Sequence, residues 1–171
     1  MIEIEKYKNN INEDWDCFVD VAHNGTIFHK QRFLSYHLSR NFQDSSYLFK
    51  KRGKIIAVFS AAIKILNSKK MLFSHPGASF GGLVYQKLSF EDCNIIIQLI
   101  EKMCKKEGIK QIVIIQTPII YNQSNELVNY CLLRNNYNNH ENYFSSILTI
   151  ENDINSQLKK IARNKKRTGN Y

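Results

Sequence analysis

The stretch from residue 45 to residue 118 most constrains the fold, because it combines strand patterns, turn signals and one helix pattern. Two apolar runs flank the polar loop Lys51–Lys54, in which Gly53 can adopt the positive φ of a tight turn, and this predicts a β-hairpin. A second turn at 67–70 leads into the apolar segment 71–85. We therefore expect a three-stranded antiparallel meander.

A helix and a buried strand are predicted after the meander. Ser89 is a possible N-cap of the helix, and Gly108 ends it. The apolar positions of this helix share one face: Ile96, Leu99, Ile100 and Met103. Residues 109–118 form an apolar, β-branched run, typical of a strand that is buried on both faces and parallel to a neighbour. We expect this strand inside the sheet, beside the glycine-bearing third strand of the meander.

Shorter patterns surround this centre and complete a mixed α/β order. The expected elements are a strand over residues 3–7, helices over 10–25, 26–38 and 125–136, a late strand over 137–150 and a basic helix over 154–171. The order predicts a mixed, mostly antiparallel sheet that is flanked by helices. Composition changes only near the end, so we expect one domain over residues 1–150 and a basic tail over 151–171.

Charge and motifs narrow the function classes. The net charge of +9, from 24 basic and 15 acidic residues, suits anionic partners without choosing among them. The sequence lacks an apolar run of about 20 residues, a signal peptide pattern and any CxxC pair, so we expect a cytoplasmic protein without a metal site or disulfide framework. Metalloprotease, NTPase and serine hydrolase motifs are also missing from it.

The glycine-rich patch Ser74–Tyr85 is the most unusual local feature. Gly77, Gly81 and Gly82 permit either a local break in the strand or a close approach of the backbone to a ligand. His75, in the same patch, could accept a proton from an acceptor amine or cap a turn before Pro76. Both pairs of alternatives stay open from the residues alone.

Three stretches together resemble a known family: "NGTIFHKQRFLSYH" (24–37), "KKRGKIIAVFSAAI" leading into "LFSHPGASFGGLVY" (50–85), and "INSQLKKIARNKKRTGN" (154–170). The chain resembles the GNAT acyltransferase fold, and in particular the N-terminal half of the Fem-type peptidoglycan-bridge aminoacyltransferases. Members of that family are about twice as long as this chain. The resemblance therefore implies an isolated N-terminal half, with the last stretch as the start of a linker to a second domain.

The resemblance also implies a reaction and its ligands. The reaction would be acyl or aminoacyl transfer to an amine or hydroxyl of a nucleotide-sugar or cell-envelope precursor, with acyl-CoA or aminoacyl-tRNA as the donor. This half of the enzyme would shape the acceptor site. The glycine loop R/Q-x-x-G-x-G/A, which holds the pyrophosphate of coenzyme A in GNAT domains, is missing ahead of "SFEDCNIIIQL". This departure leaves open whether the chain alone is catalytic; an intact single-domain acetyltransferase with an atypical coenzyme A loop is a further alternative.

The expected substrate-binding residues come from two segments, and no catalytic residue is identified. They are His29, Lys30, Tyr36, His37, His75, Ser79, Gly81 and Gly82. In the first segment, a basic cluster beside Phe28 and Phe33 could grip a phosphate or carboxylate, or could form a solvent-facing edge over a packed aromatic core.

A function of another class also fits this sequence. The chain could be a non-catalytic module that forms a homodimer or binds a second acyltransferase-like domain. In the family interpretation, the basic tail is an interdomain helix. Its other possible partners are an anionic membrane surface and a nucleic acid, the latter only as a tRNA donor.

Overall fold

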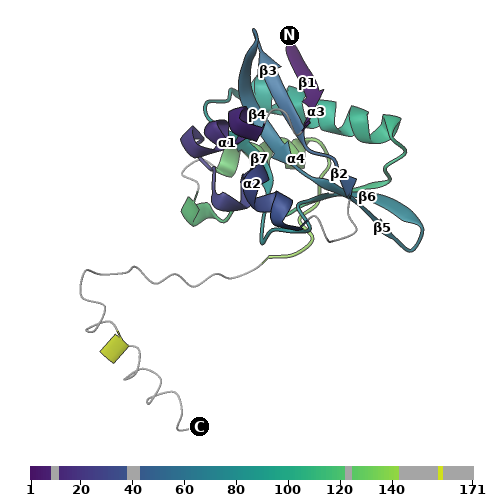
Figure 1. The fold of residues 1–171 in the computed structure, drawn as a ribbon. Coiled ribbons are helices and arrows are strands. Elements are labelled where there is room, and N and C mark those ends of the chain that lie inside the picture. The colour runs from purple at the N-terminus through teal and green to yellow at the C-terminus, as the bar shows by residue number, and fades with distance from the viewer. Residues whose placement is uncertain (9–11, 38–42, 122–124, 143–157, 160–171) are drawn as a thin grey trace. The chain divides into compact units, whose positions relative to one another are not determined.

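The computed structural model describes residues 1–8, 12–37, 43–121, 125–142 and 158–159 (Figure 1). The chain divides into two units, Met1–Asn139 and His140–Tyr171, and all named helices and strands belong to the first. Among the described residues, no helix is long and apolar enough to cross a bilayer.

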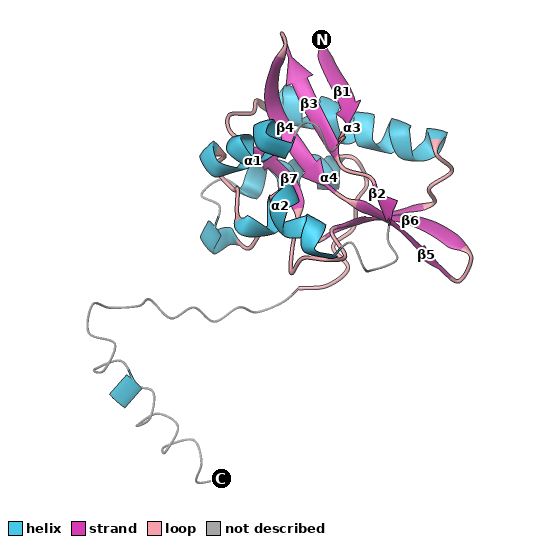
Figure 2. Ribbon diagram, viewed as in Figure 1, coloured by secondary structure: helices cyan, strands magenta, loops and turns pink. Residues whose placement is uncertain are grey.

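The first unit contains two four-stranded sheets (Figure 2). The first sheet has the order β1 (Ile2–Lys6), β3 (Tyr47–Lys51), β4 (Lys54–Ser60) and β7 (Gly82–Tyr85), and its neighbouring strands are antiparallel. The second sheet has the order β2 (Gln43–Asp44), β5 (Ala62–Leu66), β6 (Lys69–Ser74) and β8 (Gln111–Ile114). In the second sheet only the β6–β8 pair is parallel. The mixed, mostly antiparallel sheet predicted from the sequence is therefore confirmed.

The predicted meander is confirmed, with one correction. The segment 71–85 is not a single strand, because β6 ends at Ser74 and β7 begins at Gly82 in the other sheet. The opposite strand breaks at the same level, between β4 and β5. There the Ser46 hydroxyl accepts a hydrogen bond from the amide of Ala61 (3.2 Å), and the Ser45 amide donates to the Ala61 carbonyl (2.8 Å). These contacts replace ladder pairing where the chain passes from one sheet to the other.

The parallel strand β8 is confirmed, but its interior position is not. It pairs with β6 from Met71–Gln111 to Ser74–Ile114, and a single bridge joins Gly81 to Gln116 farther along. Among the described strands β8 is the last of its sheet, and Ile112–Ile114 are only half-buried. Leu83 pairs with Phe59 in the other sheet and not with this strand. The break after Ser74 causes the second difference, because it moves Leu83 into the other sheet.

Helices cover both faces of the first sheet. The helix α1 (Asn12–Val21) packs through Trp15 and Val19 on Leu48, Val58 and Val84, which project from neighbouring strands. The helix α3 (Phe90–Lys106) packs on the opposite face through Cys93, Ile96, Ile97, Ile100 and Cys104, and α4 (Asn125–Arg134) packs beside it. The apolar face predicted for α3 is confirmed.

The remaining predictions concern turns and ends. The predicted helix over 26–38 is the short α2 (Gln31–Leu34) between two 3-10 turns, Ile27–His29 and Ser35–His37. Another 3-10 turn covers Ile119–Tyr121 after β8. In the late segment, residues 137–142 are described and are not in a strand, while 143–150 lie outside the described residues. Of the basic tail, the structure describes only Leu158 and Lys159, which are helical and exposed.

Candidate functional site

The side chain of His29 ties the helical side of the molecule to the break between the sheets. Its ring is fully buried. The amide of Thr26 donates to Nδ1 (3.1 Å), so Nε2 carries the proton and donates to the Gly81 carbonyl (3.1 Å). Burial lowers the pKa of His29 to about 4. The prediction of a solvent-facing edge is therefore wrong for His29, whose ring is neutral and internal.

The backbone of His29 is also hydrogen-bonded, in this case to helix α1. Its carbonyl accepts a hydrogen bond from the indole nitrogen of Trp15 (2.8 Å) in α1. The next residue of α1 makes similar contacts. The buried carboxylate of Asp16 accepts a hydrogen bond from the amide of Gln31 (2.7 Å) and lies 3.4 Å from the Arg32 Nε. Helix α1 therefore holds this segment at His29, Gln31 and Arg32.

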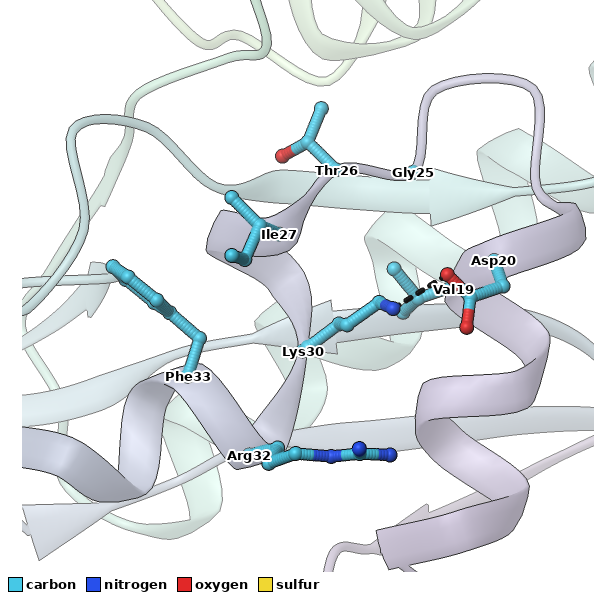
Figure 3. Close-up of a pocket in the computed structure, with 8 residues that line it drawn as sticks. All are labelled: Val19, Asp20, Gly25, Thr26, Ile27, Lys30, Arg32 and Phe33. Atoms are coloured by element: carbon cyan, nitrogen blue, oxygen red, sulfur yellow. Dashed lines mark ion pairs between the residues drawn. The ribbon is translucent and has the colours of Figure 1, made fainter.

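A pocket of about 500 Å³ opens between α1 and this segment (Figure 3). Its lining residues are Val19, Asp20, Gly25, Thr26, Ile27, Lys30, Arg32 and Phe33. Lys30 and Arg32 both point toward α1, and the Lys30 Nζ lies 2.5 Å from the Asp20 carboxylate. The Arg32 side chain is 82% exposed. The pocket thus presents two cations, one carboxylate and apolar walls.

The turn at Gly25 requires a glycine at the edge of this pocket. A Cβ at this position would lie 1.9 Å from the carbonyl oxygen of Val19, which is backbone and cannot move aside like a side chain. The close approach brings the start of the Thr26–Phe33 segment onto the end of α1. Pocket shape therefore depends on this contact.

The glycine patch lets the backbone at Gly81 and Gly82 pack closely against neighbouring segments of the chain. The Gly81 amide donates to the Ile115 carbonyl (2.8 Å), and the Ile115 amide donates to the buried Ser74 hydroxyl (3.2 Å). A Cβ on Gly81 would lie 3.0 Å from the carbonyl carbon of Ser74, and Gly82 has a φ of +90°. The neighbours of these glycines are the chain's own backbone, as in the bulge interpretation. Contact of Gly81 and Gly82 with a ligand stays a prediction.

His75 and Ser79 lie in the same connection but in different surroundings. His75 is buried, and its Nδ1 accepts a hydrogen bond from the Gly77 amide (3.1 Å), which is the turn-capping contact expected as one of two alternatives. Ser79 is exposed. His75 also lies near Gly81. A Cβ added to Gly81 would be 3.1 Å from the backbone nitrogen of His75.

Aromatic rings extend from the pocket to the glycine patch. Phe33 meets Phe28 edge to face (centroids 5.3 Å apart), Phe28 meets Phe80 (4.9 Å), and Phe80 stacks on Tyr121 (5.8 Å). Of the other predicted site residues, Tyr36 is 84% exposed, and the side chain of His37 lies outside the described part of the chain. The structure thus brings together His29, Gly81 and, through Phe80, the wall of the pocket.

Sequence reasoning missed several residues of this site. Asp16, Asp20 and Arg32 were not singled out, because carboxylates and guanidiniums on a helix pattern are usually solvated surface. Thr117 was missed too, although its hydroxyl lies 3.3 Å from the His29 Nε2 and from the Gly81 carbonyl. The predicted helical spacing of α1 puts Asp16 and Asp20 four residues apart on one face, which was the available signal.

The start of α3 is where a GNAT domain would hold the diphosphate of coenzyme A, and its residues do not fit that group. The Ser89 hydroxyl accepts the amide hydrogen bond of Asp92 (3.1 Å), as predicted for an N-cap. Glu91 and Asp92 put two carboxylates in the first turn, and paired hydrogen bonds from Lys51 (2.8 and 2.7 Å) lower the pKa of Asp92. Lys51 compensates the Asp92 carboxylate, and the Glu91 carboxylate opposes an anion at the helix N-terminus.

The other expected absences concern metals and thiols. In the described part of the chain, no group of three histidine, cysteine, aspartate or glutamate side chains could hold a metal ion. Cys93, Cys104 and Cys131 are buried and Cys17 is exposed, all as free thiols. Burial raises the pKa of Cys104 to about 12, so this thiol is not a nucleophile at neutral pH.

Comparisons with known proteins place the fold. The sequence matches no family model and no curated protein sequence. A possible acetyltransferase from Clostridium difficile 630 is 12% identical, with a TM-score of 0.56 over 88% of this chain and 99% of that one. An aminoglycoside acetyltransferase from an uncultured soil metagenomic sample, in complex with sisomicin, is 11% identical, with a TM-score of 0.57 over 86% and 97%.

The Fem-type likeness is weaker than the general one. FemX matches 63% of this chain and 25% of its own, with 15% identity and a TM-score of 0.49, which is too low to carry an argument. The single-domain acetyltransferases, in contrast, match over nearly their whole length. At these identities the similarity establishes the fold and leaves the ligands open. The chain therefore has the fold of the GNAT-type acetyltransferases.

Proposed function

We propose that this chain acts in acyl transfer and binds the acceptor, an amine or hydroxyl of a nucleotide-sugar or another cell-envelope precursor. The observation that carries the proposal is the pocket between α1 and the Thr26–Phe33 segment, in a domain whose fold is that of acetyltransferases. Its two cations suit the phosphates of such a precursor, and its apolar walls suit a ring.

The charges of the pocket define how an anionic acceptor would enter. Lys30 pairs with Asp20, whose side chain is 58% exposed and therefore free to turn toward solvent when a phosphate takes its place. The Arg32 side chain is mostly exposed, although its Nε forms an ion pair with Asp16. Two phosphate oxygens can therefore reach both cations without burying an unpaired charge.

The acyl donor is acyl-CoA or aminoacyl-tRNA in this proposal, and a partner supplies the site for it. The acidic first turn of α3 disfavours the diphosphate of coenzyme A at its usual place. A second acyltransferase-like domain or a second copy of the chain would hold the donor. This chain then contributes by aligning the acceptor.

The second candidate is a non-catalytic interaction module, and the state of the buried histidines agrees with a chain that supplies no general base. Nδ1 of His29 is occupied by the Thr26 amide, and Nδ1 of His75 accepts from Gly77. The low pKa of His29 also makes this ring a poor proton acceptor. Neither Nδ1 atom is therefore available to deprotonate an acceptor amine in this arrangement.

Calorimetric titration with a uridine diphosphate amino sugar tests acceptor binding. We expect binding heat for the natural chain and a dissociation constant at least about tenfold higher for Lys30→Gln with Arg32→Gln, because both phosphate partners are lost. A matched control, Arg52→Gln with Lys54→Gln, removes two cations from the exposed β3–β4 turn and should leave the affinity unchanged. Absence of heat with the natural chain would contradict the proposal.

Sedimentation and a thiol-release assay separate the two candidates. A stable dimer that neither binds the sugar nucleotide nor releases thiol from acetyl-CoA identifies an interaction module. Sugar-nucleotide binding by the lone chain, with thiol release only when a donor-binding partner is added, supports the acceptor-binding role.

A further inference from the structure

The β5–β6 hairpin carries exposed apolar side chains at its tip. Ile65 is 72% exposed and Leu66 is 51% exposed, although both are in a regular strand. A tight turn with positive φ at Asn67 and Ser68 closes the hairpin. Figure 1 shows this tip projecting beyond the body of the first unit. The two side chains thus lie where no described element covers them.

Lysines lie on both strands of this hairpin, where Lys70 pairs with Ile65 and Lys69 with Leu66, and also on the adjoining elements. The cluster consists of Lys64, Lys69, Lys70, Lys105, Lys106 and Lys110. The Lys70 Nζ donates to the Glu107 carbonyl (3.0 Å) at the end of α3, and the Lys110 amide donates to the Lys70 carbonyl (3.0 Å). These two contacts join the hairpin to the end of α3 and to the start of β8.

The charge of this lysine surface is almost unopposed. Between residues 64 and 70 there is no carboxylate, and between 105 and 110 there is only Glu107. The Glu107 side chain is directed to the Tyr47 hydroxyl (3.2 Å) and to Lys6 (3.9 Å), on the other side of the α3 end. Six cations and one engaged carboxylate therefore form a strong local positive field.

The mixture of cations and aliphatic side chains selects the class of partner. A nucleic-acid surface would offer aromatic rings for base stacking, but Phe73 is half-buried under Lys64, whose Nζ lies 5.8 Å from the ring centroid. Aliphatic side chains that project between lysines instead match the headgroup and acyl boundary of a bilayer. The observations favour a lipid surface over RNA.

We propose that the β5–β6 tip and its lysine surface dock the protein onto bilayers that contain anionic lipids. Ile65 and Leu66 enter the boundary region, while the lysines contact lipid phosphates. The two apolar residues alone are too few for firm insertion, so binding needs both parts and weakens as salt increases. This inference is independent of the acyl-transfer proposal, because it uses none of the pocket residues.

Vesicle co-sedimentation of the full chain tests the proposal. We expect binding to equimolar phosphatidylcholine and phosphatidylglycerol vesicles, and none to phosphatidylcholine alone. Ile65→Asp with Leu66→Asp should lower the bound fraction about tenfold, and Lys69→Glu with Lys106→Glu should do the same. The control Arg52→Glu with Lys54→Glu makes the same charge change at the β3–β4 turn and should change binding less than about twofold.

Three outcomes would overturn the proposal. The first is unchanged vesicle binding by both hairpin variants, with circular dichroism showing that they are folded. The second is loss of binding on Lys165→Glu with Lys166→Glu alone, which would assign the contact to the tail. The third is hairpin-dependent binding of a single-stranded RNA oligonucleotide without vesicle binding. If the aspartate variant does not fold, Ile65→Ser with Leu66→Ser gives the same test.

Discussion

The proposed acceptor side of the domain, which is the pocket, and the donor side, which is the start of α3, differ in charge. On the acceptor side, Lys30 and Arg32 line an open pocket between α1 and the Thr26–Phe33 segment. On the donor side, Glu91 and Asp92 occupy the first turn of α3, and Ser89 takes one of its free amides. The difference teaches that charge is distributed unevenly over one small domain, with cations at the pocket and carboxylates at the start of α3.

The acceptor side depends on His29, so its removal should give the largest effect. His29→Ala removes the hydrogen-bond partner of the Thr26 amide, leaves the Gly81 carbonyl with only the Thr117 hydroxyl and opens a cavity. We expect a loss of roughly 3–5 kcal/mol in the free energy of unfolding, measured by urea denaturation. A matched variant, His29→Gln, restores a donor and should recover part of it. A loss below about 1 kcal/mol would contradict the claim that His29 joins the Thr26–Phe33 segment to the glycine patch at Gly81.

Acid should lower the contribution of His29 to the free energy of unfolding. Because the pKa of His29 is about 4 in the folded chain and near 6.5 when unfolded, the unfolded chain binds more protons between these values. The contribution of His29 to stability is complete above pH 6.5 and falls by about 2–3 kcal/mol as the pH drops toward 4. Urea denaturation across this range checks it. An identical pH profile for His29→Gln would contradict the assignment to this ring.

The donor side should respond more weakly, and only in stability. Ser89→Ala removes the N-cap of α3 and should cost about 1 kcal/mol in the free energy of unfolding, measured by thermal denaturation. The conservative Ser89→Thr should retain most of it. Because the capped turn does not bind a diphosphate in this account, neither variant should alter heats of coenzyme A titration. A change in those heats would show that the donor side is a ligand site.

The smallest expected effect is a gain of affinity. Asp20→Asn removes the carboxylate that pairs with Lys30, so the cation is free for an anionic acceptor. We expect the affinity for the uridine diphosphate amino sugar to rise about threefold, within the range of an exposed ion pair. Glu13→Gln removes an exposed carboxylate from the start of the same helix and serves as the control. A fall in affinity would mean that Asp20 contacts the ligand itself.

The sequence predicted the features that local chemistry determines. Gly53 and Gly108 have positive φ, Ser89 caps α3, and the run after Gly108 forms a strand parallel to the meander. Each of these depends on a few neighbouring residues and a short turn. The acetyltransferase-type fold was implied by the resemblance of three stretches of the sequence to that family.

Features that depend on distant contacts could not be predicted in this way. The break between the two sheets is set by Ser46 and Ala61, which are fifteen residues apart. His29 has a polar side chain, which indicates surface in a sequence, but its partners Gly81 and Thr117 belong to other strands and turns. The lining of the pocket by Asp20 and Arg32 likewise required the packing of α1 on the next segment.

Backbone NMR of one labelled sample, titrated with the uridine diphosphate amino sugar and then with coenzyme A, tests the contrast directly. The account predicts that the sugar nucleotide shifts the amides of Thr26, Lys30, Arg32 and Phe33, while coenzyme A leaves Ser89–Asp92 unmoved. Shifts at Ser89–Asp92 with coenzyme A, together with an unchanged pocket in the first titration, would contradict it.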